Sequence, residues 1–162
     1  MESIVGRGTS VYVILPVTSN LAAGDPTALD APVRNTPRVR RPVAIVEDEP
    51  ALARVMNEHF DILGFDVSLY TDAVVAARAL SAPQPGVHLV ITDQTMPGLS
   101  GLDLARTILA AHPRLPVILC TGYSRAVNHD QAIDIGIRAF VDKPVELDAL
   151  AALAVQLLDE NE

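Results

Sequence analysis

From Pro42 onward, short runs of apolar residues alternate with segments in which apolar residues recur at helical spacing. The first run, 43–46, precedes a segment, 51–63, whose apolar positions recur every three or four residues, as on one face of a helix. This alternation repeats five times and predicts five strands, each followed by a helix. The predicted strands are 43–46, 65–70, 88–92, 115–120 and 137–141, and the predicted helices are 51–63, 72–81, 102–109, 125–135 and 147–158.

The predicted strands are apolar along their whole length rather than alternately apolar and polar. Strands of this kind, strictly alternating with helices, indicate a parallel sheet buried on both faces. Right-handed crossovers then give a doubly wound, three-layer α/β domain. The composition agrees, since 49% of the residues are apolar and there is no Trp, so Leu, Val, Ile and Ala must fill the core.

The residues before this domain follow another pattern. Residues 11–15 form a β-rich run that ends at Pro16, and residues 17–41 are rich in Thr, Asn, Pro and Arg without periodicity. The second of these segments is typical of a linker. We therefore divide the chain into 1–16, a linker at 17–41, and a domain at 42–162.

The net charge of −8 is unevenly distributed, because residues 1–42 carry five arginines against only three acids. The domain is therefore strongly acidic, which argues against nucleic-acid binding and favours a cation or a partner with a basic face. The arginines of 34–41 are interpreted as part of a solvated linker.

The single cysteine, Cys120, excludes an intramolecular disulfide. No apolar run reaches the roughly 18 residues needed to span a bilayer, and no leader peptide is recognisable at the N-terminus. We expect a cytoplasmic location and no membrane contact by this segment.

Reactive side chains follow the predicted strands. Glu47 and Asp48 follow the first strand, Asp93 the third, Thr121 the fourth and Lys143 the fifth. Because ligands of open parallel sheets bind outside the carboxyl ends of the strands, we expect these side chains to converge at one edge.

Three carboxylates at such short range repel one another unless a cation neutralises them. Mg²⁺ takes a few carboxylates together with waters and phosphate oxygens. A carboxylate beside Mg²⁺ can attack a phosphoryl group, and Lys143 and Thr121 would hold the new phosphoryl oxygens. Each residue also has a simpler interpretation: Asp48 as a helix cap, Asp93 as a loop acid, Thr121 as a cap and Lys143 as a surface lysine.

Four motifs at these positions resemble the receiver domain of two-component response regulators: Val46–Glu49, Asp93–Gly98, Thr121–Tyr123 and Lys143-Pro144. The resemblance covers about 42–160. It implies a flavodoxin-like (βα)5 fold with strand order 2-1-3-4-5. It also implies transfer of a phosphoryl group from a phosphohistidine to Asp93, so that the partner is a histidine kinase or a histidine phosphotransfer domain.

The resemblance further implies a role for each site residue. Asp48 and Asp93 would bind Mg²⁺ directly with the backbone carbonyl of Thr95, while Glu47, which stands where the family often has Asp, would reach it through water. Thr121 and Phe140 match the switch positions, whose movement would alter the surface formed by the fourth helix, fifth strand and fifth helix. Lys143-Pro144 is expected to be a cis peptide bond.

A second resemblance covers the first sixteen residues. Gly6–Ser10, followed by 11–15 and Pro16, is similar to the last glycine box and final strand of a histidine-kinase ATP-binding domain. It implies that the chain is the C-terminal part of a hybrid histidine kinase, without the boxes that build the nucleotide site. We expect the strand 11–15 to pair with a second chain, giving a dimer. Because no output domain follows residue 162, we expect the signal to pass to another protein, to the parent kinase or to a histidine phosphotransfer domain.

Two other functional classes remain open. The domain could be a receiver that is not phosphorylated and serves only in protein interaction, in which case it would not bind Mg²⁺. It could instead be an enzyme, either a kinase fragment or a small phosphatase on a similar sheet. A phosphatase would be favoured by a second acid two residues after Asp93, where this chain has Thr95.

Overall fold

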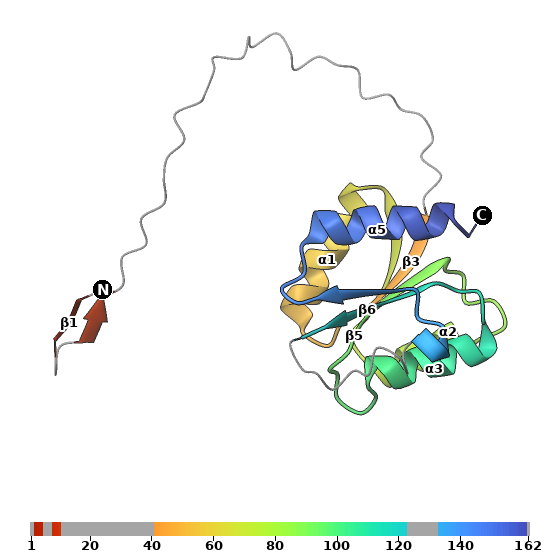
Figure 1. Ribbon diagram of the computed structural model, residues 1–162, viewed down its shortest axis with the longest axis horizontal. Helices are drawn as coiled ribbons and strands as arrows, with labels where there is room; N and C mark the ends of the chain where they lie inside the picture. Colours follow the sequence, from red (N-terminus) through yellow and green to blue (C-terminus); the bar gives the residue numbers. More distant parts are fainter. Residues whose placement is uncertain (1, 5–7, 11–40, 123–132, 162) are drawn as a thin grey trace, which may run out of the picture. The chain divides into compact units, whose positions relative to one another are not determined.

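The computed structural model describes residues 2–4, 8–10, 41–122 and 133–161 (Figure 1). The chain divides into two compact units, Met1–Thr36 and Pro37–Glu162. In the first unit, β1 (Glu2–Ile4) pairs antiparallel with β2 (Gly8–Ser10). Neither strand was predicted, and the predicted strand 11–15 lies outside the described residues.

The second unit contains a five-stranded parallel sheet. Its strands are β3 (Arg41–Val46), β4 (Phe65–Tyr70), β5 (Leu89–Asp93), β6 (Val117–Thr121) and β7 (Ala139–Asp142), in the order β4-β3-β5-β6-β7. The described helices are α1 (Pro50–Ile62), α2 (Ala73–Leu80), α3 (Gly101–Ala111) and α5 (Leu147–Asp159). The predicted strand order 2-1-3-4-5 and the flavodoxin-like fold are confirmed. Of the predicted helix 125–135, residues 133–135 are helical and the rest lies outside the described residues.

Helices cover both faces of this sheet, with α1 and α5 on one face and α2 and α3 on the other (Figure 1). Successive residues of β3 point to opposite faces, so Val43 and Ile45 pack with α1 and α5, whereas Ala44 and Val46 pack with α2 and α3. The two cores bury β5 and β6 completely.

The prediction that all five strands are buried on both faces is wrong for the edge strands. In β4 only Phe65 is buried, and β7 is half-buried or exposed throughout. An edge strand has a neighbour on one side only, so the helices cover it less completely.

Side-chain caps mark the start of two helices, α2 and α3. The Asp72 carboxylate accepts hydrogen bonds from the backbone N–H groups of Val74 and Val75 at the start of α2, at 2.8 and 3.0 Å. The Ser100 hydroxyl caps α3 in the same way. No helix in the described part of the chain is long and apolar enough to cross a membrane.

Candidate phosphoacceptor site

Three carboxylates meet at the carboxyl edge of the sheet. Glu47 and Asp48 follow β3 and Asp93 ends β5, and these strands are neighbours with Val46 opposite Thr92. One oxygen from each carboxylate lies within 4.8 Å of the others. Glu47 and Asp93 are buried and Asp48 is half-buried. The predicted convergence of these acids is therefore present in the fold.

Lys143, just after β7, reaches into this group of acids. Its Nζ atom lies 3.0 Å from Oδ1 of Asp93 and 3.5 Å from Oε2 of Glu47. Only 30% of the lysine side chain is exposed, and its backbone N–H donates to the carbonyl of Thr121 at 2.7 Å. The Lys143-Pro144 peptide bond is cis, as predicted.

The surroundings change the proton affinity of two of these groups. Burial raises the pKa of Glu47, and Asp93 adds to this, although the Glu49 N–H and Lys143 act in the opposite direction. Burial alone would lower the pKa of Lys143, but its hydrogen bond to Asp93 and the charges of Asp93 and Glu47 outweigh it, so that this pKa is raised. Lys143 is therefore a permanent cation at neutral pH.

One lysine does not balance three carboxylates. The set consists entirely of oxygen donors, two buried and one half-buried, which is the chemistry that a hard divalent cation prefers. The described residues thus fit Mg²⁺.

Thr121 and Thr95 lie at the same edge, whereas Phe140 lies within β7, two residues before its end. Thr121 ends β6 and is buried, and its hydroxyl donates to Oδ1 of Asp142 at 3.5 Å. Thr95 is exposed in the loop that follows Asp93. Phe140 is half-buried on β7 and packs against the core shared by α2 and α3.

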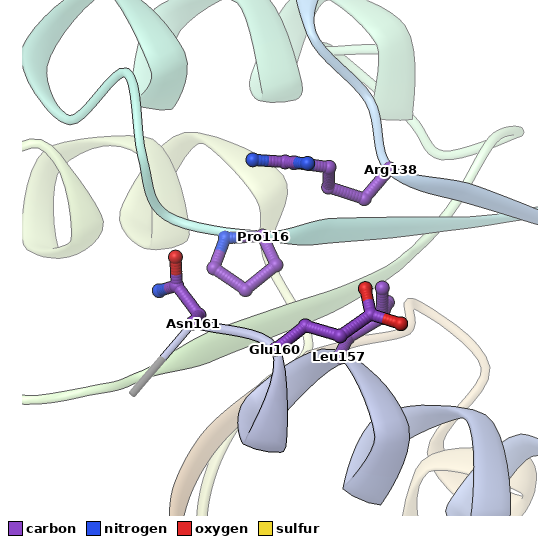
Figure 2. Close-up of a pocket in the computed structure, with 5 residues that line it drawn as sticks. All are labelled: Pro116, Arg138, Leu157, Glu160 and Asn161. Atoms are coloured by element: carbon purple, nitrogen blue, oxygen red, sulfur yellow. The ribbon is translucent and has the colours of Figure 1, made fainter.

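The described hollows lie at the other end of the sheet. Pro116 precedes β6 and Arg138 precedes β7, so the hollow in Figure 2 is at the amino edge, away from the carboxylates; its lining residues are Pro116, Arg138, Leu157, Glu160 and Asn161. Two further hollows share Asn161. None of these three hollows is lined by Glu47, Asp48 or Asp93.

Two contacts at this edge were not predicted from the sequence, that of Gln94 with Asp93 and that of Asp142 with Thr121. The Gln94 N–H donates to Oδ1 of Asp93 at 2.7 Å. Adjacency to Asp93 was the only signal for Gln94, and it does not reveal where a side chain binds. The end of the fifth predicted strand places Asp142 at the same edge as Asp93, but this position does not reveal that its carboxylate accepts from Thr121.

Comparisons with known sequences agree with this geometry. The profile of the response regulator receiver domain matches residues 43–155, more than half of the chain. The C4-dicarboxylate transport transcriptional regulatory protein DctD of Rhizobium meliloti is 39% identical over 112 residues, which are 69% of this chain and 24% of that protein. Sensor protein EvgS of Escherichia coli is 28% identical over 158 residues, 97% of this chain and 13% of that protein. The chain thus spans well under two thirds of each.

Solved structures show the same fold. A CheY-like response regulator receiver domain protein from Methanospirillum hungatei has a TM-score of 0.70 at 22% identity, covering 75% of this chain and 96% of that one. The receiver domain of sensor histidine kinase PA1611 from Pseudomonas aeruginosa, with a magnesium ion coordinated in its active site cleft, has a TM-score of 0.65 at 22% identity, covering 74% and 98%.

Proposed function

We propose, from the premise that this chain belongs to the response regulator receiver family, that Asp93 is the residue that accepts the phosphoryl group. The chain contains a receiver domain, the phosphoacceptor domain of two-component signalling. The observation that supports Asp93 is its contact with Lys143, 3.0 Å from Oδ1, inside a group of three carboxylates.

The acidic group would also hold the metal that the transfer requires. Asp48 and Asp93 would bind Mg²⁺ directly together with the backbone carbonyl of Thr95, and Glu47 would bind through a water. When bound, Mg²⁺ neutralises charge on the phosphoryl oxygens and on the acids.

The protein's own groups do the rest of the chemistry. An oxygen of Asp93 attacks phosphorus while the bond between phosphorus and the histidine nitrogen breaks, and the nitrogen keeps the electron pair. Lys143 holds a positive charge beside the acceptor oxygen and stabilises the phosphoryl group that arrives there. The Thr121 hydroxyl, which contacts Asp142 before transfer, would turn to donate to a phosphoryl oxygen.

That movement supplies the switch. When Thr121 turns toward the phosphoryl group, the ring of Phe140 would turn inward, which would change the outer surface of β7 and α5. The signal is steric, because Phe has no hydroxyl to form a new hydrogen bond.

Intact-mass measurement after incubation with acetyl phosphate tests this function. The chain should gain one phosphoryl group only when Mg²⁺ is present, and Asp93→Asn should abolish the gain. Asp66→Asn, which changes an exposed aspartate on β4, is the matched control and should be phosphorylated normally. A chain that gains no phosphoryl group and binds no Mg²⁺ would instead be a receiver used only for protein interaction.

We also propose that the parent protein is a hybrid histidine kinase, with a kinase or phosphotransfer histidine as the donor. The alignment with sensor protein EvgS, which covers 97% of this chain, supports an origin of residues 1–16 outside the receiver, and the antiparallel pair β1–β2 is compatible with the end of a kinase domain. If residues 11–15 join two copies, light scattering should find a dimer that Val13→Lys converts to a monomer.

A further inference from the structure

Gln94 forms hydrogen bonds in three directions, although the proposed function gives roles only to its two neighbours, Asp93 and Thr95. Its backbone N–H donates to Oδ1 of Asp93 at 2.7 Å and to the carbonyl of Cys120 on β6 at 2.9 Å. Its backbone carbonyl accepts from the N–H of Gly101 at 3.0 Å. Its side-chain Oε1 accepts from the N–H of Leu102 at 3.1 Å. One residue therefore connects the acceptor carboxylate, the next strand and the start of α3.

The first N–H groups of a helix have no partner within the helix and need acceptors from elsewhere. In α3, Gln94 supplies the acceptors for the first two N–H groups, those of Gly101 and Leu102. The third N–H group, that of Asp103, donates to the Ser100 hydroxyl at 3.2 Å. The Gln94 carboxamide thus acts as a helix cap from eight residues before its partner.

The hydrogen bonds from the N–H groups of Gly101 and Leu102 to Gln94 tie the two ends of segment 94–101 together, so that the segment forms a closed loop. Thr95, whose carbonyl is the proposed third Mg²⁺ ligand, lies inside this loop directly after Gln94. Loss of the carboxamide would leave only the backbone hydrogen bond between Gln94 and Gly101 to join the two ends of the loop, and would leave the Leu102 N–H without its acceptor. A loosened loop would present Thr95 less uniformly beside Asp93.

We infer that the Gln94 carboxamide is a positioning residue: by bonding the N–H of Leu102, it holds the loop that carries the Thr95 carbonyl against Asp93 and so strengthens Mg²⁺ binding. This inference rests on the proposed function. It concerns the side chain only, since the backbone bonds of residue 94 remain in any substitution other than proline.

The test compares Gln94→Leu with Ser100→Ala in the whole chain. Each variant removes one acceptor from the first turn of α3, so both weaken the same helix end, but only the first acts on the segment next to Asp93. The readouts are the Mg²⁺ dissociation constant, from the shifts of amide signals in NMR spectra, and the hydrogen-exchange rate of the Leu102 amide. Phosphorylation by acetyl phosphate is measured on the same samples.

We expect Gln94→Leu to weaken Mg²⁺ binding roughly tenfold, which is the usual effect of removing a residue that holds a metal ligand in place. The same variant should speed hydrogen exchange of the Leu102 amide. Ser100→Ala should leave the Mg²⁺ dissociation constant within about twofold of wild type, because its hydroxyl does not contact the loop start. Equal weakening in both variants would mean a general effect of the helix end and would overturn the inference.

Unchanged Mg²⁺ binding in Gln94→Leu, with a wild-type chain that binds Mg²⁺ and is phosphorylated, would overturn the inference and leave the proposed function intact. A wild-type chain that neither binds Mg²⁺ nor gains a phosphoryl group would overturn the proposed function, and the inference with it.

Discussion

The backbone carbonyl of Asp93 occupies the space that a Cβ atom on Gly101 would need. Such an atom would lie 2.9 Å from the carbonyl carbon of Asp93 and 2.7 Å from Cδ1 of Leu119, closer than real Cβ atoms approach. Helix α3 can therefore begin against the end of β5 only because residue 101 has no side chain. The carboxyl end of β5 and the start of α3 are thus held together at Asp93.

Gly101→Ala should accordingly destabilise the domain and displace the loop between Asp93 and α3. We expect a loss of roughly 1–3 kcal/mol in the free energy of unfolding, typical of overpacking a buried site, measured by urea denaturation. Gly122→Ala is the matched control, because a Cβ atom there meets nothing within 4 Å. Equal stability of the two variants would show that α3 can shift without cost.

Lys143→Met should weaken the fold most when Mg²⁺ is absent. The change leaves Asp93 and Glu47 without their cation, at a cost of roughly 1–3 kcal/mol in unfolding free energy. Saturating Mg²⁺ should recover much of this loss, since the metal neutralises the same carboxylates. Arg106→Met, which breaks the exposed pair with Asp103, should cost less than about 1 kcal/mol with or without Mg²⁺. A loss of stability in Lys143→Met that Mg²⁺ does not reduce would contradict this account.

Glu47→Gln should change how stability depends on pH. Because burial raises the pKa of Glu47 in the folded chain, the folded state holds this proton more tightly than the unfolded state does. Stability from this group is present below its ordinary pKa of 4.5 and is lost as pH rises through the raised value. In Mg²⁺-free buffer the variant should therefore gain stability over wild type between pH 4 and pH 7. A difference that stays constant over this interval would count against a raised pKa.

Cys120 should resist alkylation in the folded chain. The side chain is 2% exposed, and burial raises the pKa of its thiol to about 12, so almost no thiolate forms at neutral pH. Iodoacetamide at pH 8 should leave the native protein unmodified but should label it fully in urea, as followed by intact mass. Rapid labelling without denaturant would show that β6 is accessible in the native state.

The elements of the sheet were largely predictable because their signals are local. The prediction for 65–70 coincides with β4, since Gly64 and the start of α2 bracket a short segment in which apolar residues alternate with polar ones. The strand predicted at 115–120 begins two residues later, because the Leu115 N–H donates to the carbonyl of His112 in a turn before β6 begins. The pair β1–β2 was missed because neither three-residue strand carries a distinctive apolar pattern.

The sequence predicted the position of those site residues that stand at or just after the end of a strand. Glu47, Asp48, Asp93 and Lys143 converge because neighbouring parallel strands end at the same edge. The orientation of the Thr121 hydroxyl toward Asp142, and the bond from Leu102 to Gln94, depend on side-chain geometry between separate elements. No spacing in the sequence encodes those contacts, so they become visible only in the folded chain.

The most direct test of the central claim is to locate the phosphoryl group on the chain. Borohydride reduces an acyl phosphate to a primary alcohol and releases the phosphate, so it marks the acceptor after incubation with acetyl phosphate and Mg²⁺. Tandem mass spectrometry of the digested protein should find the alcohol at residue 93 and at no other acid. An alcohol at Asp48 or Glu47, or a phosphorylated chain with no reduced residue, would contradict the assignment of Asp93.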